Sequence, residues 1–112
     1  MIRLLGFLLL LPGATYAASY SCNFETECYE DEPCRDSRFT VDVYDMEQKI
    51  VTEFGEFPIL AIRDEPGLLT VFVHAPGSVY LLSSSADTAR FTTHITQGPQ
   101  VISYLGHCEV VG

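Results

Sequence analysis

Four cysteines are the residues of this chain whose type and spacing carry the clearest chemistry. Cys22, Cys28 and Cys34 follow one another with five residues in each gap, and Cys108 stands near the other end of the chain. Common zinc frameworks and thiol redox centres use closer pairs such as Cys-x-x-Cys. Neither pattern occurs, and the sequence therefore predicts two structural disulfides rather than a metal or redox site.

Four cysteines allow three pairings, and the alternation of neighbouring residues favours one of them. Cys22 alternates with Tyr20 and Phe24, and Cys108 ends a similar apolar alternation over residues 102–108. Alternate residues of a strand share one face, so both cysteines are expected to face the same core. The other two cysteines share one polar segment and can pair with each other. The predicted bridges are Cys22–Cys108 and Cys28–Cys34.

Signatures of catalysis do not stand out in the chain. It contains no Gly-x-Ser-x-Gly motif and no glycine-rich phosphate loop. A metal site would need His74, His94 and His107 to converge from separate segments, and we expect them instead at the surface. We therefore predict a protein that is not an enzyme and that uses no cofactor and no metal.

The charge of the chain restricts its partners. Fifteen Asp and Glu face six Lys and Arg, a net charge of −9. Such acidity argues against nucleic acid and anionic membrane surfaces and is compatible with a basic protein. Residues 25–38 hold six of the acids without the Asp-x-Asp-x-Asp-Gly order of a dedicated calcium site. Within this segment we expect Glu30, Asp31 and Glu32 to form a partner-binding surface.

The first 18 residues have the composition of a secretory signal peptide. A lone arginine precedes a short run of leucines, Pro12-Gly13 interrupts the run, and small residues follow up to Ala18. The apolar run is too short for a membrane span, and no lipoprotein pattern precedes Cys22. We expect residues 19–112 to form one domain in the periplasm or secreted, with no membrane anchor.

Short alternating runs separated by turn residues predict an all-β fold for this domain. A small antiparallel meander of about eight strands is expected to close into a barrel or flattened barrel tied by the disulfides, with a two-sheet sandwich as the alternative. Residues 25–38 are expected to form a loop. The expected strands are residues 20–24, 39–44, 49–54, 57–62 and 68–73, and three more within residues 78–111, divided by turns at 84–88 and 96–100.

Three segments resemble those of a group of short exported proteins from proteobacteria. They read Tyr20-Ser21-Cys22, Phe24-Glu25-Thr26-Glu27-Cys28 and Tyr104-Leu105-Gly106-His107-Cys108. The resemblance covers most of the mature chain. It implies export, and it implies no particular activity.

One turn is similar to the inhibitory loop of periplasmic inhibitors of c-type lysozyme, which are β-barrels. That loop carries Ser-Gly-x-x-Tyr, and this chain matches it at Gly77 and Tyr80. Pro76 stands at the serine position, and Ser78 offers a hydroxyl two residues later. The resemblance implies that Gly77, Ser78 and Tyr80 contact a partner.

These observations lead to two hypotheses about function. The first is a monomeric, non-catalytic binding or inhibitor module for a basic protein. The alternative is a carrier of a small apolar ligand inside a lipocalin-like barrel, which requires an interior cavity. The interior of the barrel discriminates between these hypotheses. A carrier needs an interior cavity, whereas side chains can fill the interior of a barrel of this size.

Overall fold

A computed structural model describes residues 18–97 and 100–111. The predicted signal peptide, apart from its last residue, lies outside the described residues, and so do residues 98 and 99 of the turn expected at 96–100. Within the described ranges, no helix has the length and hydropathy that a membrane span requires.

Eight strands form one closed antiparallel sheet in which each strand pairs with the next along the chain. The first strand also pairs with the last, and this contact closes the barrel. The prediction of an all-β meander closing into a barrel is confirmed, and the sandwich alternative does not apply. The strands are β1 (Tyr20–Tyr29), β2 (Arg35–Tyr44), β3 (Lys49–Thr52), β4 (Gly55–Glu65), β5 (Leu68–Ala75), β6 (Ser78–Ser84), β7 (Ala89–Ile95) and β8 (Gln100–Val110).

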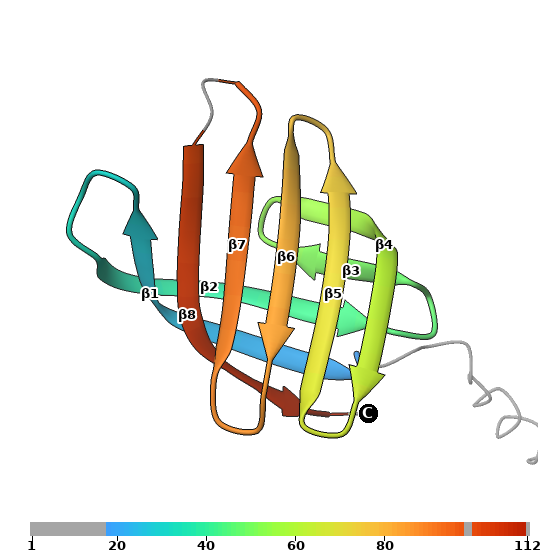
Figure 1. The fold of residues 1–112 in the computed structure, drawn as a ribbon. Coiled ribbons are helices and arrows are strands. Elements are labelled where there is room, and N and C mark those ends of the chain that lie inside the picture. The colour runs from blue at the N-terminus through green and yellow to red at the C-terminus, as the bar shows by residue number, and fades with distance from the viewer. Residues whose placement is uncertain (1–17, 98–99, 112) are drawn as a thin grey trace, which may run out of the picture.

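The barrel is flattened into two layers whose strands cross at a steep angle (Figure 1). Strands β5 to β8 stand side by side, and β1 to β3 run across them. The pairing register shifts between Phe24 and Thr26 in β1 and between Ile59 and Ala61 in β4. Bulges of this kind bend and twist strands, which lets β1 and β4 pass from one layer to the other.

The two predicted disulfides are confirmed. Cys22 pairs directly with Cys108 across β1 and β8, and a bond joins them with 86 residues of sequence separation. The Cys22 side chain is fully buried, and Cys108 packs against the core from a half-buried position. The second bond joins Cys28 to Cys34 across the β1–β2 turn. Disulfides of this kind indicate an oxidising environment.

The loop expected over residues 25–38 is much shorter in the structure. Strand β1 continues to Tyr29 and β2 begins at Arg35, so only residues 30–34 connect them. The charge density of the segment suggested a loop, but several of its charged side chains are solvent-exposed and so do not oppose strand pairing. Pairing with β8 continues as far as Tyr29 and Ile102, which holds this hairpin in the sheet.

Aromatic rings occupy the middle of the barrel. Phe24, Phe39 and Phe91 pack against one another with ring centroids 5.5–6.2 Å apart. Tyr104 stacks on Phe39 at 4.4 Å, and Tyr80 packs on Phe91 at 5.3 Å. Buried aromatic side chains remove large apolar areas from water and dominate the energetics of small cores.

Candidate functional site

Consecutive antiparallel strands place the turns of the barrel alternately at its two ends. The β1–β2, β3–β4, β5–β6 and β7–β8 turns share one end, which we call the hairpin end. The remaining turns and the described ends of the chain lie at the opposite end, the termini end (Figure 1). The two segments predicted to bind a partner, around Glu30 and around Gly77, therefore lie at the same end of the barrel.

The β5–β6 turn presents only part of its predicted contact motif to solvent. Gly77 is exposed at the tip with φ +76°, and Ser78 is half-buried. Tyr80 is only 8% exposed, and its ring packs against Phe57 and Phe91 in the core. Tyr80 therefore belongs to the core beneath the turn, and the accessible surface of the motif consists of Gly77 and Ser78.

The three acids predicted in the β1–β2 turn are all exposed. Glu32 accepts a hydrogen bond from the Arg35 guanidinium at 2.7 Å, and this guanidinium also lies 5.2 Å from the centre of the Tyr29 ring. Glu30 and Asp31 form no ion pair with any described residue. The disulfide between Cys28 and Cys34 closes the base of this turn.

The structure adds a small pocket at the hairpin end that the sequence did not reveal. Its volume is about 230 Å³. Glu27 from β1 and Glu53 from the β3–β4 turn contribute carboxylates, and the stacked rings of Phe39 and Tyr104 contribute an aromatic surface. The lining residues are Glu27, Ser37, Arg38, Phe39, Glu53 and Tyr104.

The bulge in β1 explains why Glu27 reaches this pocket. Before the register shift the inward residues of β1 are Cys22 and Phe24, whereas after it Glu27 lies directly opposite the inward Tyr104. A shift of one residue exchanges the two faces of a strand. If the alternation that begins with Cys22 and Phe24 had continued without a bulge, Glu27 would lie on the outer face.

An exposed aromatic residue stands beside the pocket. Phe54 is 60% exposed in the β3–β4 turn, and its ring lies 5.6 Å from that of Phe39. The sequence placed Phe54 at the end of a strand, but β3 ends at Thr52. The glycine at position 55 is the sequence signal that could have located this turn. In the structure it adopts a φ of +136°, which residues other than glycine rarely adopt.

Burial and the carboxylates at the hairpin end raise the pKa of two tyrosines, the buried Tyr104 and the half-buried Tyr29. Burial raises the pKa of Tyr104 to about 12, with further contributions from the negative charges of Glu27 and Glu53. Burial and the Glu27 carboxylate also raise the pKa of Tyr29. Both effects favour the neutral phenol, whose hydroxyl can donate a hydrogen bond.

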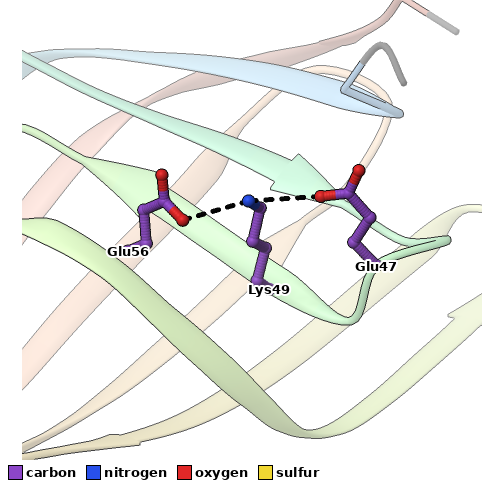
Figure 2. Close-up of polar contacts among 3 residues, drawn as sticks. All are labelled: Glu47, Lys49 and Glu56. Atoms are coloured by element: carbon purple, nitrogen blue, oxygen red, sulfur yellow. Dashed lines mark hydrogen bonds and ion pairs between the residues drawn. The ribbon is translucent and has the colours of Figure 1, made fainter. Parts of the chain in front are cut away.

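Two of the three lysines and arginines elsewhere in the described chain, Lys49 and Arg63, are paired with carboxylates, and Arg90 is not. Figure 2 shows Lys49 between two carboxylates, with its amine 3.2 Å from Glu47 and 3.0 Å from Glu56. The donated hydrogen bonds to Glu56 and Glu47 raise the pKa of the Lys49 amine. Arg63 pairs in the same way with Glu65 at 3.3 Å. Surface pairs of this kind contribute little stability, but they neutralise charge locally.

The hairpin end, by contrast, keeps an excess of negative charge. Two arginines, Arg35 and Arg38, stand among six carboxylates there. The six are Glu27, Glu30, Asp31, Glu32, Asp36 and Glu53. This end can attract cations and basic surfaces, and the attraction is screened by salt.

The termini end is held by a hydrogen bond across the barrel. The Tyr20 hydroxyl donates to Asp64 at 2.6 Å, which links the start of β1 to the end of β4. This hydrogen bond, followed by burial, raises the pKa of Tyr20 to about 12.

The raised phenol pKa values predict a loss of stability in strong base. Tyr20 and Tyr104 hold their protons more tightly in the folded state than in the unfolded chain, where a tyrosine titrates near 10. The contribution is therefore complete below about pH 10 and is lost as the pH rises toward about 12. Urea unfolding across this range is expected to show the decline. The double variant Tyr20→Phe/Tyr104→Phe should flatten it, and an unchanged slope would contradict the assignment.

The histidines do not assemble a metal site among the described residues. His74 and His94 are exposed on the outer face, and His107 lies 3.2 Å from the Glu25 carboxylate. No cluster of three or more potential metal ligands occurs in residues 18–97 and 100–111.

Comparison of the chain with protein-family models, curated protein sequences and solved structures found no significant match.

Proposed function

We propose that this chain is a non-catalytic, exported binding module that captures a basic protein through the hairpin end of its barrel. The observation that carries the proposal is the composition of that end. Two segments expected to bind a partner lie there together with unmatched carboxylates and the exposed ring of Phe54. Aromatic residues surrounded by polar groups commonly anchor protein interfaces.

The proposed setting is the periplasm or the extracellular space, where the module acts as a monomer. The two disulfides and the leader-like composition of residues 1–18 support export. The negative charge would speed the encounter with a basic partner at low salt.

The aromatic interior supports this function over the carrier of an apolar ligand. Phe24, Phe39, Phe91 and Tyr104 fill the middle of the barrel with rings in mutual contact. A carrier of this size would need that space for its ligand.

A pull-down with matched charge variants tests the proposal. The mature, disulfide-bonded chain is immobilised and exposed to c-type lysozyme and to periplasmic extract at low salt. We expect a basic protein to be retained and released by salt. The variant Glu30→Gln/Asp31→Asn/Glu32→Gln should weaken its binding by about tenfold or more, since several charges at one interface are lost.

The control removes equal charge from the opposite end. Glu65, Asp87 and Glu109 are exposed at the termini end, and each of the two triplets contains one acid that is paired with an arginine. Glu65→Gln/Asp87→Asn/Glu109→Gln should change the affinity for the basic protein by less than about threefold. Salt screens the interaction between exposed charges, so charges at the opposite end act weakly on a partner at the hairpin end. Retention of no protein, or equal weakening by both variants, would overturn the proposal.

A further inference from the structure

The pocket between Glu27 and Glu53 differs from the acidic surface around it. Its two carboxylates come from strand β1 and from the β3–β4 turn, and neither forms an ion pair with a described residue. The same pocket is lined by an aromatic wall, in which Tyr104 stacks on Phe39. The exposed Phe54 ring extends this wall toward solvent.

Tyr104 adds to the pocket a hydrogen-bonding group that is independent of the carboxylates. Its side chain is only 6% exposed, yet it lines the pocket. Its hydroxyl makes no hydrogen bond with any residue in the described part of the chain, and its oxygen is not among the buried polar atoms that lack a partner there, so it is accessible. A phenol hydroxyl that lines a pocket and has no protein partner can hydrogen-bond to water or to a ligand there.

We infer that this pocket receives one organic cation, the ammonium or guanidinium of a lysine or arginine side chain on the basic partner. The inference rests on the proposed function and names its central contact. Glu27 and Glu53 would accept charge-assisted hydrogen bonds from the cation. The rings of Phe39 and Phe54 would receive the apolar stem, and their faces attract positive charge. A volume of about 230 Å³ suits the end of one side chain.

Arg38 also lines the pocket and opposes the cation. It is exposed, and it forms no ion pair with a described residue. One positive charge among two carboxylates leaves the pocket negative, but it competes with an incoming cation for the same oxygens. Replacing Arg38 by glutamine should therefore tighten cation binding. This direction is opposite to the effect expected if the pocket held an anion.

Capped tripeptides with a central arginine, lysine or citrulline are suitable probes. Citrulline keeps the shape of arginine and lacks its charge. Each peptide is titrated into the isotopically labelled mature chain, and amide chemical shifts are followed by NMR. We expect the arginine and lysine peptides to shift the amides of Glu27, Glu53 and Tyr104, and the citrulline peptide to leave them unchanged. Shifts caused equally by all three would overturn the inference.

Matched variants separate the pocket from general attraction. Glu27→Gln/Glu53→Gln should weaken binding of the arginine peptide by about 10- to 100-fold, the range expected for losing charge-assisted hydrogen bonds. Glu30→Gln/Asp31→Asn removes the same charge from the same end outside the pocket and should weaken it by less than about threefold. Arg38→Gln should strengthen it.

Other outcomes of these experiments would contradict this inference or the proposed function. If the two double variants of acidic residues weakened peptide binding equally, only net charge would attract the peptide. If the Arg38→Gln variant bound the arginine peptide more weakly, the pocket would prefer anions. Calcium ions that shift the same amides and displace the peptide would assign the carboxylates to a metal. Peptide binding in the pocket without capture of a basic protein would refute the proposed function alone. Capture that Glu27→Gln/Glu53→Gln leaves unchanged would refute this inference alone.

Discussion

Replacing Cys22 and Cys108 together by alanine is expected to lower the free energy of unfolding by about 4–5 kcal/mol. The bond closes a loop with a sequence separation of 86, so its loss releases a large conformational entropy in the unfolded chain. It also joins β1 to β8, the contact that closes the barrel. Urea unfolding of the oxidised protein, followed by circular dichroism, measures the change.

The second disulfide provides the control. Cys28 and Cys34 are separated by only six positions and close a single turn. The same entropy argument gives about 2 kcal/mol for Cys28→Ala/Cys34→Ala, and the barrel should remain folded. Equal losses in the two double variants would contradict the distinction between one tether across the whole chain and one local staple.

Gly106→Ala is expected to destabilise the barrel by at least about 3 kcal/mol, toward the upper end of what overpacking costs. Gly106 lies opposite Phe24, next to the bulge that bends β1. A Cβ at this position would overlap the carbonyl oxygen of Asn23 and lie 2.6 Å from the Cα of Phe24. These are backbone atoms, so relief requires β1 and β8 to separate. Thermal and urea unfolding measure the loss.

Gly77→Ala is the matched glycine control. A Cβ there meets no atom within 4 Å, and the cost arises only from the φ of +76°. This strain is worth about 1 kcal/mol. If Gly106→Ala proved as mild as Gly77→Ala, the close approach of β1 and β8 at the bulge would be wrong.

Residue alternation was sufficient to predict the tether across the barrel. Tyr20, Cys22 and Phe24 share a face, and so do Tyr104 and Cys108, because no bulge interrupts either run. The apolar runs and turn residues likewise predicted the positions of most strands. These features are local, and each depends on the period of a strand and the chemistry of a turn.

The pocket could not be predicted in the same way. Glu27 faces inward only because β1 shifts register after Phe24, and the sequence of that segment does not mark the shift. Glu53 and Phe54 approach Tyr104 through closure of the barrel, which brings together residues about 50 positions apart in the chain. The density of charge in residues 25–38 suggested a loop, whereas tertiary pairing with β8 extended the strand.

Hydrogen–deuterium exchange of the mature protein, alone and with the basic protein retained in the pull-down, tests most directly whether the hairpin end is the binding surface. Binding at the hairpin end should protect the β1–β2, β3–β4 and β5–β6 turns, with the amides around Glu53 and Gly77 among those affected. The turns of the termini end, around Gly67 and Asp87, should exchange at the same rate in both samples. Protection at the termini end, or on the outer face of β5 to β7 with free exchange at the hairpin end, would contradict binding at the hairpin end.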